Sequence, residues 1–108
     1  MKAENSGLIS VKIYHVSNEF GEQTVIAACD AKYLGKIFRE KELILDVNRE
    51  FYSGELYTVE EAIKLLRTGT ILNLVGEQII NAAIKEGLVH KDAIIRISGV
   101  PHAQVVRI

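Results

Sequence analysis

The feature that most constrains the fold is a change in hydrophobic period along the chain. Apolar and polar residues alternate over Leu8–Val16, which is the period of two of a half-buried strand. Gln23–Cys29, Ala93–Ile97 and Ala103–Ile108 are also rich in β-forming residues. Over Val59–Leu66, in contrast, the apolar residues repeat with helical spacing. The pattern therefore predicts strands at both ends of the chain and helices in the middle.

The first main helix has a clear start signal. Thr58 and Glu61 have the spacing of a capping box, in which the Thr58 hydroxyl binds the N3 amide and Glu61 binds back to the cap. The apolar residues that follow all lie on one face of the helix. Gly69 is expected to end this helix as its C′ residue.

A second main helix is predicted over Ile71–Glu86, with Thr70 as its cap and Gly87 as its stop. Gly76 lies inside this segment, where a glycine costs about 1 kcal/mol relative to alanine. We therefore expect Gly76 to permit the close approach of a neighbouring element. The close approach of a ligand is the alternative.

The remaining segments complete the predicted order. Asp30 is expected to cap a short helix over Ala31–Lys36, and Glu42–Val47 to form a third strand. Asn48–Glu55 is interpreted as a loop, and Gly99–His102 as the turn between the last two strands. The order β-β-α-β-α-α-β-β favours an α+β fold. We expect a mixed or antiparallel sheet built from two terminal hairpins and a middle strand.

Composition limits the classes of protein. The length of 108 residues suits one domain, over residues 8–108, with residues 1–7 as a flexible extension. Thirteen basic and 14 acidic side chains argue against a strongly basic protein that binds nucleic acid non-specifically, although a local basic patch is compatible. A single cysteine excludes an intramolecular disulfide, and no apolar stretch approaches the roughly 20 residues of a membrane span. We expect a cytoplasmic protein without membrane contact, of a composition compatible with a thermophile.

Two residue types suggest chemistry. Cys29 precedes a predicted helix start, where a thiol can have a lowered pKa; the alternative is a small buried residue. His90 and His102 flank a predicted strand, so roughly 20 Å of extended chain separates them and no shared metal is expected. His102 is expected at an exposed loop tip, where it either binds a partner or only the backbone. No cofactor motif is present, and no cofactor is expected.

Basic and aromatic residues suggest binding. Tyr33 and Phe38 are interleaved with the densest basic cluster, which consists of Lys32, Lys36, Arg39 and Lys41. Such a cluster can contact phosphates and stack on bases, although a solvated face is the alternative. Phe51 and Tyr52 form an aromatic pair that either covers an edge of the core or binds a ligand.

Five blocks occur in a characteristic order: Val25–Asp30, Leu34–Arg39, Phe51–Glu55, Asn73–Glu77 and Ser98–Gln104. Together they resemble a small archaeal family catalogued as domain of unknown function 424, and the resemblance covers residues 9–108. The resemblance implies that the polar residues inside the blocks belong to the family pattern, without assigning them roles. With Tyr52, they are the candidate site residues: Cys29, Asp30, Arg39, Glu55, Asn73, Glu77, His102 and Gln104.

Three functions remain open. The first is a non-catalytic binding protein linked to translation, which contacts RNA or a ribosome-associated protein. The second is a small enzyme or small-molecule binder whose pocket gathers Cys29, Arg39, Asn73, Glu77 and His102. The third is an interaction module that forms a homodimer through a helix face or through an exposed strand edge such as that of the terminal strand 103–108.

Overall fold

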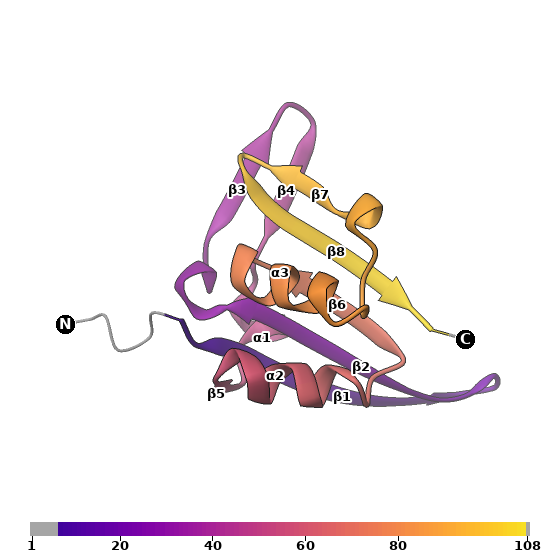
Figure 1. The fold of residues 1–108 in the computed structure, drawn as a ribbon. Coiled ribbons are helices and arrows are strands. Elements are labelled where there is room, and N and C mark those ends of the chain that lie inside the picture. The colour runs from indigo at the N-terminus through magenta and orange to yellow at the C-terminus, as the bar shows by residue number, and fades with distance from the viewer. Residues whose placement is uncertain (1–6, 108) are drawn as a thin grey trace.

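The computed structural model describes residues 7–107, which form a six-stranded mixed sheet covered on both faces (Figure 1). The predicted extension, except for Gly7, lies outside this range. The strands of the main sheet are β1 (Ile9–Asn18), β2 (Gly21–Asp30), β5 (Glu55–Tyr57), β6 (Ile71–Val75), β7 (Ile95–Ile97) and β8 (Val100–Val106). Their order is β5-β1-β2-β6-β8-β7, and only the pairing of β2 with β6 is parallel. The predicted α+β class, with a hairpin near each end of the chain, is confirmed.

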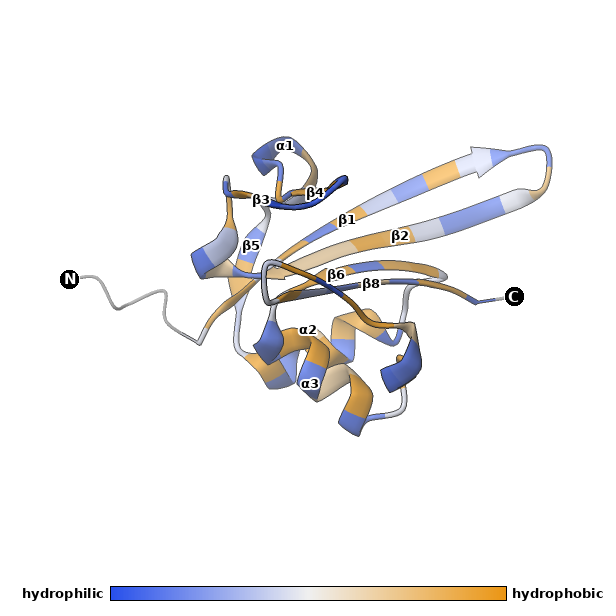
Figure 2. Cartoon of the chain, turned by 90° about the horizontal axis from the view of Figure 1, so that it is seen from above, coloured by the Kyte–Doolittle hydropathy of each residue, from blue (hydrophilic) through white to orange (hydrophobic). Residues whose placement is uncertain are grey.

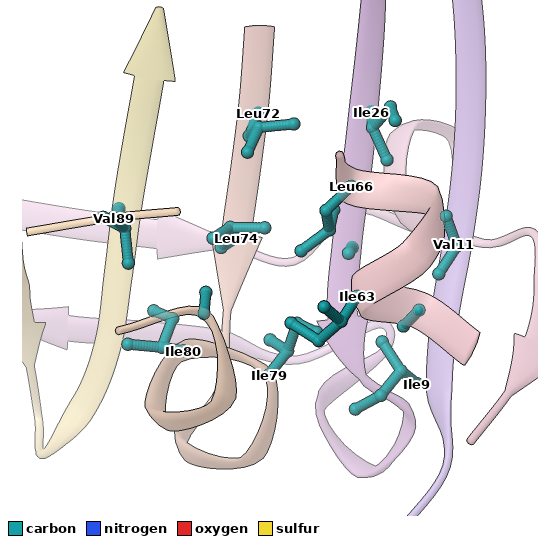
Figure 3. Close-up of a cluster of buried hydrophobic side chains, with 14 residues drawn as sticks. Ile9, Val11, Ile26, Ile63, Leu66, Leu72, Leu74, Ile79, Ile80 and Val89 are labelled. Atoms are coloured by element: carbon teal, nitrogen blue, oxygen red, sulfur yellow. The ribbon is translucent and has the colours of Figure 1, made fainter. Parts of the chain in front are cut away.

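Two helices cover one face of this sheet. They are α2 (Val59–Leu66) and α3 (Glu77–Lys85), and Figure 2 shows both on the same side of the strands. Figure 3 shows their isoleucine and leucine side chains meeting those of β1, β2 and β6. The buried residues of this helix-side core are Ile9, Val11, Ile26, Ala28, Ala62, Ile63, Leu66, Leu72, Leu74, Ile79, Ile80, Ala83, Val89 and Ala103. No helix within residues 7–107 is long and apolar enough to cross a membrane.

The opposite face carries a second, smaller layer (Figure 2). It consists of α1 (Arg49–Tyr52) and a separate two-stranded sheet of β3 (Ile37–Glu40) and β4 (Leu43–Asp46). The buried residues of this hairpin-side core are Ala27, Cys29, Leu45, Val47, Tyr52, Val75, Ile97 and Val100. This layer does not cover the whole face, and Val106, on the same face of the sheet, is 68% exposed.

The prediction of a helix over Ile71–Glu86 is wrong in its first half. Residues Ile71–Val75 are β6, and the helix begins only after Gly76, which has φ +113° and is the N-cap of α3. β6 is buried on both faces of the sheet, so its apolar run lacks the alternation of a half-buried strand. Such a run cannot be distinguished from a buried helical turn by its periodicity.

Two further predictions are wrong near the middle of the chain. The helix expected over residues 31–36 is only a 3₁₀ turn at Ala31–Tyr33, and the chain then enters β3. The expected loop 48–55 contains α1 and the start of β5, which pairs with β1. The expected middle strand exists as β4, but it pairs with β3 and not with the main sheet. These segments are short and are fixed by long-range pairing, which local pattern does not reveal.

The turn near the C-terminus lies earlier than predicted. Ser98 and Gly99 have φ of +51° and +82°, as in the two-residue turns that match the twist of a hairpin. His102 therefore lies within β8, between Val75 of β6 and Ile95 of β7, and not at a loop tip. Because β8 pairs with β6 and β7, the terminal strand is not an edge strand as expected; the edges are β5 and β7.

The end of α2 also differs from the prediction. The capping box is confirmed, since Thr58 Oγ1 accepts from the Glu61 amide and Glu61 accepts from the Thr58 amide. Gly69, however, does not have the positive φ of a C′ glycine. It allows close packing, because a Cβ there would lie 2.8 Å from Ile26 Cδ1. Thr70 does not cap a helix, and its hydroxyl instead binds the backbone of Thr24 on β2.

Candidate functional site

An open groove of about 640 Å³ lies beside the hairpin-side layer, where that layer leaves the sheet uncovered. We call it the central groove. Its floor is formed by Asn73 of β6 and by His102 and Gln104 of β8. Asn73 and Gln104 are register partners, so their side chains point to the same face of the sheet. Three of the sequence candidates are therefore brought together here, from positions about 30 residues apart in the chain.

The floor residues already have some of their hydrogen bonds. Gln104 Nε2 donates to Asn73 Oδ1 at 2.8 Å, which leaves Gln104 Oε1 and the Asn73 amide group free to bind. His102 Nδ1–H donates to the Leu74 carbonyl at 2.9 Å. This bond fixes the tautomer of the neutral ring and leaves Nε2 as an acceptor. The half-buried His102 is thus a positioned acceptor and not a flexible side chain.

Three aromatic residues form the wall of the groove: Tyr14 of β1 and the α1 residues Phe51 and Tyr52. The Tyr14 and Phe51 rings stack with centroids 5.4 Å apart, and the Tyr14 hydroxyl donates to the Phe51 carbonyl at 2.7 Å. Ser10 fixes this wall from below, since its hydroxyl donates to the Tyr52 carbonyl and accepts from the Gly54 amide, both at 2.9 Å.

The Tyr52 hydroxyl is an available donor. The side chain is 5% exposed and lines the groove, and its hydroxyl has no hydrogen-bond partner among residues 7–107. Within residues 7–107 no fully buried side-chain nitrogen or oxygen lacks a hydrogen-bond partner, so the hydroxyl retains some exposure to solvent. Burial, with a smaller contribution from Cys29, raises the pKa of Tyr52 to about 12, which keeps the hydroxyl protonated.

Asp46 of β4 and Glu50 of α1 also line the groove, and both are exposed. Sequence reasoning did not single out these two residues or Tyr14. Alternation along β1 predicts that Tyr14 shares a face with Ser10, but nothing in the sequence indicates that α1 lies above it. The pairing of distant elements decides which residues line this site.

Cys29 lies under the hairpin-side layer and is fully buried. Burial, and then the neighbouring Asp30 carboxyl, raises the pKa of its thiol to about 12. Val75 lies between Cys29 and His102 in the register of the sheet, which separates their Cα atoms by two strand spacings, about 10 Å. Cys29 is thus a buried apolar residue, as in the second interpretation of the sequence.

Asp30 and Glu77 form a different cluster at the start of α3. The Asp30 carboxylate accepts from the amides of Gln78 and Ile79 at 2.9 and 3.0 Å, so it caps α3 and not the turn that follows it in sequence. Glu77 pairs with Lys32 at 2.9 Å and accepts from the Tyr33 hydroxyl at 2.8 Å. These contacts hold α3 against the segment after β2.

Four exposed basic side chains form what we call the basic patch: Lys36, Arg39, Lys41 and Arg49. Arg39 is paired with Ile44 on the face of the β3–β4 hairpin opposite the buried Leu45. Arg49 lies over Gly35, where a Cβ would be 2.8 Å from its Nε. Sequence reasoning missed Arg49 and included Lys32, which is paired with Glu77.

The remaining candidates lie elsewhere. Glu55 is exposed on the edge strand β5, where it accepts from the Tyr57 hydroxyl at 3.2 Å. Neither Arg39 nor Glu77 lines the central groove. Within residues 7–107, no three His, Cys, Asp or Glu side chains are arranged to hold a metal ion.

Comparison with known proteins places the chain in a family. No curated protein is significantly similar to it. The chain is similar to the solved structure of an uncharacterized conserved protein from Methanopyrus kandleri, with 26% identity, 94% of each chain covered and a TM-score of 0.76. The family described as "Protein of unknown function (DUF424)" matches residues 17–108, nearly the whole chain. The chain therefore belongs to the DUF424 family.

Proposed function

We propose that this protein is a non-catalytic, cytoplasmic binding protein of the translation machinery that contacts RNA through the basic patch. The observation that carries the proposal is that Lys36, Arg39, Lys41 and Arg49 are exposed and have no salt bridge to any residue in 7–107. Glu40, between two of them, accepts from the Ser98 amide at 2.7 Å. With the exposed Glu40 and Glu42 beside them, these four cations form a set of six charged side chains with a net charge of +2 on a nearly neutral protein.

The surroundings of the candidate reactive side chains, Cys29 and Glu77, favour a binding role over catalysis. Cys29 is buried with a raised pKa, and Glu77 is bound by Lys32 and Tyr33. RNA binding is favoured over self-association because both edges of the sheet, β5 and β7, are three residues long. Short edges are poor templates for pairing with another copy.

The test is a salt titration with purified archaeal ribosomal subunits and with a labelled single-stranded RNA of mixed sequence. If the four side chains contact phosphates, the logarithm of affinity falls with the logarithm of salt concentration with a slope of about −3. The double variant Arg39→Glu, Lys41→Glu is expected to weaken binding strongly. The matched control is Lys64→Glu, Lys85→Glu, which makes the same charge change on exposed sites of α2 and α3, across the sheet. Absence of binding at low salt, or equal loss in the control, contradicts the proposal.

A further inference from the structure

We propose that the central groove binds the guanidinium group of an arginine side chain, presented by a basic segment of a partner protein. This inference does not depend on RNA binding, because the basic patch does not line the groove. The groove has the volume of an ordinary ligand site, and it is open, as the insertion of a side chain from another chain requires.

The charged residues around the central groove favour a cationic ligand. Among residues 7–107, Asp46 and Glu50 are the only acidic residues that line the groove, and no lysine or arginine in that range lines it. Neither carboxylate forms a salt bridge with any residue in 7–107. Lys12 is close, but its ammonium donates to the Glu50 backbone carbonyl at 2.8 Å. A phosphate group would meet two carboxylates here, whereas a cation would be attracted by both.

The hydrogen-bonding groups that remain free also select a donor-rich ligand. The acceptors are Gln104 Oε1, His102 Nε2 and the carboxylates of Asp46 and Glu50, because Gln104 Nε2 and His102 Nδ1–H are already bonded. The free donors within residues 7–107 are fewer, namely the amide groups of Asn48 and Asn73 and the Tyr52 hydroxyl. Guanidinium has five donors and no acceptor, while phosphate has acceptors only and a nucleobase has both.

The positions of the acceptors around the groove favour arginine over lysine as the ligand. The acceptors come from different elements, with the exposed Asp46 on β4 and with Gln104 and His102 on β8. A planar fork of donors can reach acceptors on several sides at once, whereas an ammonium is a compact point charge. The half-buried Phe51 ring provides aromatic surface beside which a guanidinium can lie. The Tyr14 ring is stacked on Phe51 and already has Lys12 Nζ 5.4 Å from its centroid.

The test is an NMR titration of the full chain with the blocked tripeptide acetyl-Gly-Arg-Gly-amide. Three ligands serve for comparison: the same peptide with lysine, the same peptide with the uncharged isostere citrulline, and guanosine monophosphate. We expect the arginine peptide to shift the side-chain amide resonances of Asn73 and Gln104 and to bind most tightly. Asp46→Asn is expected to weaken its binding about fivefold, the upper range for an exposed ion pair.

The matched control is Asp92→Asn, which removes an exposed carboxylate outside the groove and is expected to leave binding unchanged. Failure of the arginine peptide to shift the Asn73 and Gln104 amides overturns the proposal, as does equal binding of the citrulline peptide. Preferential binding of guanosine monophosphate also overturns it and assigns the groove to a nucleobase. An unchanged affinity in Asp46→Asn also overturns the proposal, because attraction by this carboxylate is part of it.

Discussion

Gly76 connects strand β6 of the main sheet to helix α3, which packs on one face of that sheet. Its φ of +113° turns the chain from β6 into α3, and the absence of a side chain leaves room for the Asp30 carboxyl that caps the helix. A Cβ at this position would lie 2.6 Å from Asp30 Oδ2. The sequence interpretation that Gly76 permits close approach of a neighbour is therefore correct, although the glycine precedes the helix and does not lie inside it.

Substitution of this glycine should be costly. Gly76→Ala is expected to lower the free energy of unfolding by about 3 kcal/mol or more, because an unfavourable φ and a steric overlap with Asp30 act together. Urea denaturation measures the loss. The control is Gly87→Ala, which also has a positive φ, +75°, but has no atom within 4 Å of the added Cβ. It is expected to cost only about 1 kcal/mol; equal losses would rule out the overlap with Asp30.

Cys29 gives a prediction about pH. Its thiol pKa rises from 9.0 in the unfolded chain to about 12 in the folded protein, chiefly through burial. Below pH 9 both states keep the proton, so the contribution to stability is complete. Between pH 9 and about 12 the unfolded state loses the proton first, and up to about 4 kcal/mol of stability is lost.

Measurement of unfolding free energy across this pH range in Cys29→Ala should show a shallower decline than in the natural protein. Because the thiol is buried, Ellman's reagent should also label the native protein only as fast as it unfolds. Rapid labelling of the native protein at neutral pH would contradict both expectations.

At the scale of elements, α1 has only four residues and too few internal hydrogen bonds to be stable alone. Asn48 caps it, with Oδ1 accepting from the amides of Glu50 and Phe51. Ser10 of β1 then fixes its far end through the Tyr52 carbonyl and the Gly54 amide. The buried Ser10 hydroxyl is therefore one anchor of the groove wall, beside the bonds from Tyr14 and Lys12 to the α1 carbonyls.

Ser10→Ala is expected to cost about 1–3 kcal/mol, because it leaves a buried carbonyl and amide without their partner. It should also change the chemical shifts of the Tyr52 ring, since α1 loses the bond to its Tyr52 carbonyl. The control is Ser53→Ala in the same segment, because the Ser53 hydroxyl has no hydrogen bond to any residue in 7–107. A variant as stable as the natural protein would show that α1 is held without Ser10, by its aromatic contacts and the bonds from Tyr14 and Lys12.

At the scale of the whole molecule, the two layers on the sheet differ in their attachment. α2 and α3 pack on the larger helix-side core, whereas the β3–β4 sheet has backbone ladder bonds only between its own strands. Ile37 and Ile44 on that hairpin remain more than half exposed. A two-stranded sheet with so little burial is marginal without support, so this layer is the less stable part of the fold.

Native-state hydrogen exchange tests this difference. Amides of β3 and β4, such as those of Phe38 and Leu45, should exchange through a partial opening of lower free energy than amides of β2 and β6. The expected order has Ala28 and Leu74 close to the global free energy of unfolding. Exchange of both groups at the same free energy would mean that the two layers unfold together.

Much of the fold could be predicted from local pattern. The β1–β2 hairpin, the capping box at Thr58 and the α+β class follow from periodicity and cap chemistry, which act between residues close in sequence. The presence of a strand, β6, just before Gly76 could not be predicted. A strand buried on both faces has the same apolar run as a buried helix. The family resemblance was likewise available from five sequence blocks, and the family match confirms it.

The sequence by itself therefore determined the class of fold, the capped helix and the apolar face with which that helix packs on the sheet. Only the tertiary structure decided which polar residues meet. It separated Cys29, Arg39 and Glu77 from His102, and it placed His102 with Asn73, Gln104 and Tyr52 around one groove. The physical reason is that the parallel pairing of β2 with β6, and the position of α1 above the sheet, are long-range contacts. Their partners are more than 40 residues apart, a distance over which local propensity carries no information.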